Sequence, residues 1–292
     1  MLNSFQIQLA LSVAGYPTVA ASLVLGVARL AKPASAARRC ALVAAATAGL
    51  LTSYLGLSGL PKVPPVDSIG WVPVGTLCAG LVGVAFGATA GNAGARQRAV
   101  VMAIALVAVI AAFLAGKPVF AQSIGRVLPF GLGAALISAQ VVANAPGVAQ
   151  RGSAVGGWLA LLCTAVLAAL CALWGASASL AMLLGSMAAT AGVLGIGGLI
   201  LHLDEPTPTA QGVFIVHMSA LLTYAHLFAN LPILPLVLLA ASLLAPTVSR
   251  RVPGTAGRRR WLRAVVVVAA AIVLAGSAAA IMHGEAGEEA AM

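Results

Sequence analysis

The chain contains ten stretches of apolar residues that are almost free of acidic and basic side chains. A helix needs about 20 such residues to cross the roughly 30 Å hydrocarbon core of a bilayer. In lipid every backbone N–H and C=O must bond inside its own segment, and runs of this length achieve that only as helices. The pattern therefore predicts an all-α, polytopic transmembrane bundle of about ten spanning helices. The predicted spans are residues 5–28, 40–60, 71–91, 99–116, 127–145, 153–174, 177–201, 212–231, 233–246 and 262–282.

Composition favours the same class. Hydrophobic residues make up 61% of the chain and charged residues only 8%, whereas soluble domains carry about 25% charged residues. Ten spans with short connections use up the 292 residues, so we expect a single integral membrane domain over residues 1–292. The ninth span is short and follows Pro232, with Pro235 inside it. The eighth and ninth spans could therefore form a re-entrant pair instead of two crossings.

The basic residues predict an orientation. Lys and Arg are enriched in short loops on the cytoplasmic side of a membrane. Thirteen of the sixteen lie in alternate gaps, which places both termini outside, together with the acidic tail that carries Glu285, Glu288 and Glu289. We expect a multi-pass protein of a bacterial cytoplasmic membrane. The thirteen are Arg29, Lys32, Arg38, Arg39, Arg96, Arg98, Arg151, Arg250, Arg251, Arg258, Arg259, Arg260 and Arg263.

The net charge of +10 could suggest a nucleic-acid partner, since neutralising phosphates takes many Lys and Arg residues. Here the charges are spread over several loops, so we expect no nucleic-acid partner. One cluster is denser and lies beside an interfacial tryptophan, Trp261. We expect it to bind anionic lipid headgroups, which makes the bilayer the main partner. The cluster consists of Arg258, Arg259, Arg260 and Arg263.

Chemistry at membrane depth is left to a few polar residues, and the eighth span is the richest. Four of them recur at steps of four, three and four and fall within roughly 60° of a helix surface. His217 and Tyr224 align on the opposite face. A helix that is polar on two faces should lie centrally in the bundle. The stripe consists of Ser219, Thr223, His226 and Asn230.

Two interpretations of this stripe remain open. Intramembrane ionisable and polar groups mark ligand sites and pathways, but they also form hydrogen bonds between helices. Gln140 and Asn144, one turn apart in the fifth span, and Ser12 in the first present the same choice. An uncharged lining of this kind suits a neutral or zwitterionic solute.

A third cluster could hold a metal ion. His202, Asp204 and Glu205 gather at the end of the seventh span, and His217 is the nearest further ligand. Their Asp-Glu-Pro-Thr-Pro context is also typical of a turn between helices. No GxSxG or HExxH motif accompanies them, so we expect no cofactor and do not favour an enzyme.

These observations rank three functions. The first is a carrier or facilitator for a small uncharged or zwitterionic solute. It would not use carboxylate-driven proton coupling, because no Asp or Glu lies in a predicted span. The second is a non-catalytic subunit or assembly factor that binds other membrane proteins. The third is an intramembrane metal site or enzyme.

Overall fold

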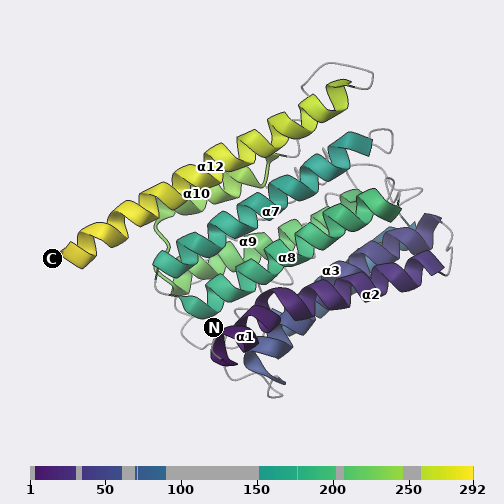
Figure 1. Ribbon diagram of the computed structural model, residues 1–292, viewed down its shortest axis with the longest axis horizontal. Helices are drawn as coiled ribbons and strands as arrows, with labels where there is room; N and C mark the ends of the chain where they lie inside the picture. Colours follow the sequence, from purple (N-terminus) through teal and green to yellow (C-terminus); the bar gives the residue numbers. More distant parts are fainter. Residues whose placement is uncertain are drawn as a thin grey trace.

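The computed structural model describes residues 4–30, 35–60, 70, 72–89, 151–175, 177–201, 207–245 and 258–291. Within these residues all regular secondary structure is helical, which confirms the predicted all-α class. The helices lie side by side in one bundle (Figure 1). Every statement below concerns this part of the chain.

The first helical stretch changes its winding partway along. It consists of α1 (Ser4–Ala10), a π-helical segment η1 (Leu11–Gly15) and α2 (Tyr16–Leu30). Pro17 explains the change, because a proline ring inside a helix clashes with the carbonyl four residues earlier, here that of Val13. Widening one turn into a π-bulge relieves such a clash. The stretch remains helical from residue 4 to residue 30, in agreement with the first predicted span.

The other helices are close to the predictions. Helices α3, α4, α7 and α8 match their predicted spans to within five residues at each end, whereas α9 begins five residues before its span, α10 ends four residues early and α12 ends nine residues late. The predicted spans 99–116 and 127–145 lie outside the described residues. The helices are α3 (Ser35–Ser58), α4 (Val72–Thr89), α7 (Arg151–Trp174), α8 (Ala178–Leu201), α9 (Thr207–Phe228), α10 (Ile233–Ser242) and α12 (Arg258–Ala291).

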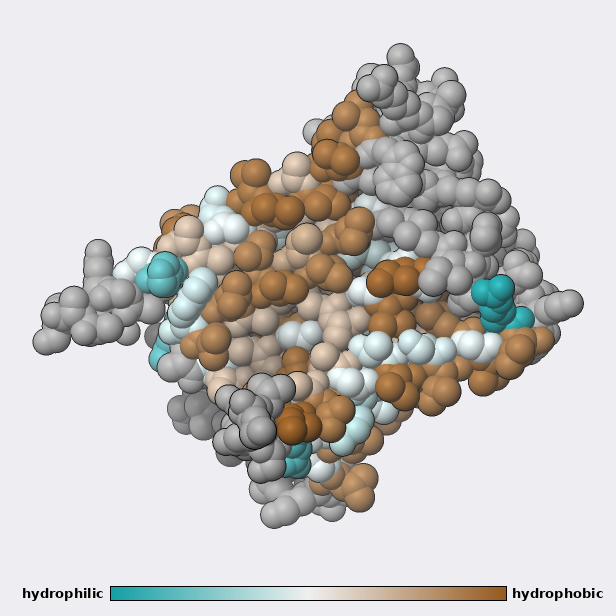
Figure 2. Space-filling model, in the orientation of Figure 1, coloured by the Kyte–Doolittle hydropathy of each residue, from teal (hydrophilic) through white to brown (hydrophobic). Residues whose placement is uncertain are grey.

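Five of the described helices are long and apolar enough to cross a membrane. Their outer faces carry large apolar side chains such as Leu23 and Val27 of α2 and Val273 of α12, each more than 60% exposed. Apolar side chains also dominate the face of the molecule in Figure 2. The five segments are Ile7–Leu30, Cys40–Ser58, Gly156–Trp174, Ala178–Gly197 and Val265–Gly284.

Neighbouring contacts show that consecutive helices alternate in direction. Ser12 of η1 contacts Gly56 of α3, and Thr190 of α8 lies against Gly49 of α3. Helix α9 runs the same way as α3, because Val213 and Val43 meet at Gly83 near the starts of these two helices. Helices α7 and α12 run the same way as α9, because Trp158 contacts Phe214 edge to face near the starts of α7 and α9, and Trp174 packs against His283. Apart from α10, which ends beside the middle of α7, these helices begin and end near one of two ends of the bundle.

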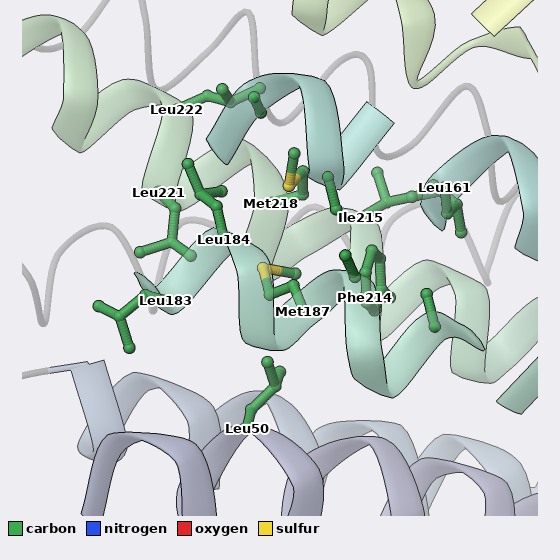
Figure 3. Packing of buried hydrophobic residues seen from close by; sticks show 14 of the residues in the cluster. Leu50, Leu161, Leu183, Leu184, Met187, Phe214, Ile215, Met218, Leu221 and Leu222 are labelled. Atoms are coloured by element: carbon green, nitrogen blue, oxygen red, sulfur yellow. The ribbon is translucent and has the colours of Figure 1, made fainter. Parts of the chain in front are cut away.

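The core is built from apolar side chains of α3, α7, α8 and α9. Figure 3 shows Phe214 and Met218 of α9 facing Leu184 and Met187 of α8, with Leu50 of α3 on the far side. Each of these side chains is less than a tenth exposed.

Glycines of α4 bring three helices into close contact. A Cβ atom at Gly83 would lie 2.5 Å from Val213 of α9 and 2.8 Å from Val43 of α3. A Cβ atom at Gly80 would lie 2.6 Å from the hydroxyl of Thr47. Small residues at such places let membrane helices approach closely. The junction of α3, α4 and α9 therefore depends on the missing side chains.

We predict that Gly83→Ala lowers the free energy of unfolding by about 1–3 kcal/mol, because the new methyl group overpacks a filled junction. The matched control is Gly26→Ala on the exposed face of α2, where nothing lies within 4 Å of the new Cβ. That variant should be neutral or stabilised, since alanine is the better helix former. Unfolding of the purified variants in mixed micelles provides the measurement. Equal effects at the two positions would contradict this packing.

Candidate functional site

The site is centred on α9, which is buried on every side. Each residue from 210 to 223 is buried, and the helix packs against α3, α4, α7, α8 and α10. The predicted central position of this helix is confirmed. Its polar side chains are therefore enclosed by protein. They are Gln211, His217, Ser219 and Thr223, each at most 6% exposed.

Two members of the predicted stripe, Ser219 and Thr223, lie together in this interior. The Thr223 hydroxyl donates to the Ser219 carbonyl oxygen at 2.8 Å, so its hydrogen is used within the helix. The Ser219 hydroxyl has no hydrogen-bond partner in the described part of the chain. This half of the stripe is present as expected.

In the other half of the stripe, the prediction for Asn230 is wrong. Helix α9 ends at Phe228, and Asn230 is exposed in a left-handed conformation with φ 52°. Asparagine tolerates that conformation better than most residues, and the chain turns there, with the amide of Leu231 donating to the carbonyl of Ala225. Asn230 therefore shapes the exit turn and does not extend the helical stripe.

His226 lies at the same turn. Its imidazole is half-buried, and Nδ1 lies 2.7 Å from the carbonyl oxygen of Leu231. A carbonyl can only accept, so Nδ1 must carry the hydrogen. The side chain joins the end of α9 to the segment that leads into α10. Part of its hydrogen-bonding capacity is thus used to hold the turn.

His217 lies deeper, nearly three turns into α9 and only 4% exposed. Its Nδ1 lies 2.9 Å from the carbonyl oxygen of Val213, whereas Nε2 has no partner among the residues that the structure describes. Tyr224, seven residues later and half-buried, continues the same face of the helix.

Two hydrogen bonds join neighbouring helices, and the partners in both could not be predicted from the sequence. The hydroxyls of Ser242 on α10 and Thr164 on α7 lie 3.1 Å apart, both buried. Ser12 of η1 donates to the carbonyl oxygen of Gly56 at 3.0 Å, which supports the helix-packing interpretation for that residue. Isolated Ser and Thr residues in apolar runs carry no signal that would identify such partners.

Helix α10 is short. Its ten residues span about 15 Å, and it ends at Ser242, beside Thr164 near the middle of α7. The chain tightens there into a turn in which the amides of Leu243 and Leu244 donate to the carbonyls of Ala240 and Ala241, and Ala245 is helical again.

Most of the remaining candidate residues lie outside the described part of the chain. Gln140 and Asn144 lie outside the described residues, as do His202, Asp204 and Glu205. The basic cluster forms the start of α12. Because α9 begins at Thr207, the backbone of His217 lies about 15 Å along the axis from the start of that helix. The described residues contain no group of three or more His, Cys, Asp or Glu that could hold a metal ion.

Comparison with known protein families, curated proteins and solved structures finds no match to this chain.

We predict that Asn230→Gly leaves stability unchanged or slightly raised, because glycine adopts φ near 52° without a penalty. Asn230→Val should lower the free energy of unfolding by about 1–2 kcal/mol, since a β-branched residue is strained there. Thermal unfolding in detergent measures the stability of both variants. A loss of stability in the glycine variant would show that the asparagine side chain, and not its backbone conformation, holds the turn.

Proposed function

We propose that this chain is a carrier or facilitator for a small uncharged or zwitterionic solute, with α9 as the helix that lines its path. The observation that carries the proposal is a fully buried central helix with polar side chains at membrane depth. A purely structural central helix would be expected to be apolar. Ser219, Thr223 and His217 are the proposed contacts, with His226 at the exit turn.

Hydrogen bonding within the bundle accounts for only some of these groups. Thr223 bonds its own helix, but the Ser219 hydroxyl and His217 Nε2 have no partner in the described part of the chain. An unsatisfied buried polar group costs about 1–3 kcal/mol. A bound solute that hydrogen-bonds to these groups would recover this cost.

The charge pattern limits the kind of solute. No carboxylate lies within the apolar spans, so the transported species would be one that needs no fixed countercharge.

We expect the purified protein to raise the permeability of liposomes to one or more neutral or zwitterionic solutes. A suitable panel is glycerol, erythritol, urea, glycine and betaine, measured by light scattering against empty liposomes. Ser219→Ala should then lower the flux about three- to tenfold, the worth of one hydrogen bond. Ser22→Ala, which removes the same atom from an exposed site on α2, is the matched control.

Two outcomes would contradict the proposal. A flux that Ser219→Ala leaves unchanged would show that α9 does not line the path. Absence of flux, together with one stable companion protein in mild detergent, would favour the non-catalytic membrane subunit. The exposed apolar side chains of α2, such as Leu23 and Val27, offer such a companion a surface that lipid would otherwise cover.

The proposal includes ten spans in a bacterial cytoplasmic membrane with both termini outside. Its support is the location of the described basic positions at one end of the bundle, where α2 ends and α3, α7 and α12 begin. Helix α4 ends and α7 begins at that same end, because Gly83 lies beside Val43 near the start of α3. An even number of crossings between residues 89 and 151 satisfies this arrangement. The positions are Arg29, Arg38, Arg39, Arg151, Arg258, Arg259, Arg260 and Arg263.

Two leucines at opposite ends test the orientation. Leu30, 84% exposed, ends α2 at the basic end, and Leu60, 87% exposed, follows α3 at the other. In a variant without the four native cysteines, Leu60→Cys should react with a membrane-impermeant maleimide in intact cells. Leu30→Cys should react only after permeabilisation. The opposite pattern would invert the topology, and equal labelling of both would contradict a spanning bundle.

A further inference from the structure

Three buried polar atoms have no hydrogen-bond partner among the described residues: Ser53 Oγ, Ser219 Oγ and His217 Nε2. Each of the two serine hydroxyls can still form a hydrogen bond within its own helix, because a helical hydroxyl can rotate toward the carbonyl three or four residues earlier. Ser186 and Thr190 do so in this chain. The imidazole of His217 has no such freedom. Its Nδ1 is held by Val213, and Nε2 lies on the other side of the ring.

The bond to Val213 determines the character of Nε2. Because the carbonyl of Val213 can only accept, Nδ1 carries the hydrogen, and Nε2 of the neutral ring presents a bare lone pair. Protonation would add a second N–H and a charge in a site that is 4% exposed. A buried charge without a partner is costly, and no carboxylate lies in the apolar spans. In the described part of the chain, His217 Nε2 is therefore a hydrogen-bond acceptor without a donor.

The surroundings of His217 follow from the junction of α3, α4 and α9. Val213, one turn earlier on the same stripe, meets Val43 and Gly83. Since α9 runs parallel to α3 and antiparallel to α4, one further turn brings Thr47 and Gly80 to the level of His217. Those two residues also contact each other.

The hydroxyls near this level offer acceptors as well. Thr47 donates to the carbonyl of Val43 at 2.9 Å. Thr76, one turn before Gly80 in α4, donates to the carbonyl of Val72 at 2.8 Å. Each hydroxyl has therefore used its only hydrogen and keeps its oxygen lone pairs. Among the described residues, Thr47, Thr76 and His217 therefore offer acceptors at this junction, and none of the three keeps a free donor.

We propose that His217 Nε2 is the acceptor that binds the transported solute, and that this solute is a neutral molecule with N–H or O–H donors, such as a polyol, a urea or a primary amide. The inference rests on the proposed function and adds the chemical class. A neutral imidazole whose Nδ1 bonds a carbonyl also suits a metal ion. Such a site needs further ligands, and the described residues contain no cluster that supplies them.

The first test compares two amide side chains of different length at position 217. Glutamine at position 217 can place a carbonyl oxygen near the position of Nε2, whereas asparagine is too short to do so. We expect His217→Asn to lower uptake of radiolabelled glycerol and urea into proteoliposomes about three- to tenfold, the worth of one hydrogen bond, and His217→Gln to retain most of it. Thermal unfolding of both variants checks that they fold.

Competition tests the solute class with the wild-type protein. Acetamide and N,N-dimethylacetamide share a carbonyl acceptor, but only acetamide carries N–H donors. Acetamide should inhibit the uptake of glycerol and urea, and N,N-dimethylacetamide should not. Equal competition, or equal uptake by the asparagine and glutamine variants, would overturn the inference while leaving a carrier in place.

A spectroscopic test is independent of transport. In protein labelled with ¹⁵N-histidine, added glycerol, urea or acetamide should shift the Nε2 resonance of His217, because a lone pair that accepts a hydrogen bond changes its shielding. The resonance of His283 is the internal control. If no solute of the panel is transported, the proposed function fails. An Nε2 resonance that none of the three molecules shifts overturns the inference whether or not transport is found.

Discussion

The structure depends on one constraint: polar groups at membrane depth must find partners inside the protein. Most of them bond the backbone of their own helix, as Thr47, Thr76 and Thr223 do. A few join two elements, as Ser12 and Ser242 do. The atoms left over lie on α3 and α9, in the interior of the bundle. The candidate site is thus defined by the hydrogen bonds that the fold does not make.

Close packing sets where these atoms lie. Gly80 and Gly83 let α4 approach α3 and α9 so closely that Thr47, Val43 and Val213 fill the space of the missing side chains. This approach brings the face of α9 that carries His217 against two other helices. The absence of side chains at these two glycines is therefore what fixes the junction.

The helices of the described chain could be predicted from the sequence because apolar run length and backbone bonding together determine them. The position of Asn230 could not be predicted in this way. The four-residue spacing placed it on a helical stripe, but a left-handed residue after Phe228 ends the helix first. The different surroundings of His217 and His226 could not be predicted either. Both rings bond a backbone carbonyl through Nδ1, but the partner of His217 is Val213 in its own helix, whereas the partner of His226 is Leu231, beyond the helix. The tight turn after Ser242 likewise leaves no mark in an apolar run.

The pairing of α7 with α12 affects how the protein is made. The two helices run parallel and share a small apolar cluster with Ala160 on one side and Val267 and Ala271 on the other. More than eighty residues separate the end of α7 from the start of α12. In the proposed membrane bundle, Ala160 can therefore contact α12 only after that helix has been inserted, and until then it faces Ala245 or lipid. An alanine side chain is apolar and loses little by facing lipid. Helix α12 can then pack against a bundle in which α9 is already enclosed.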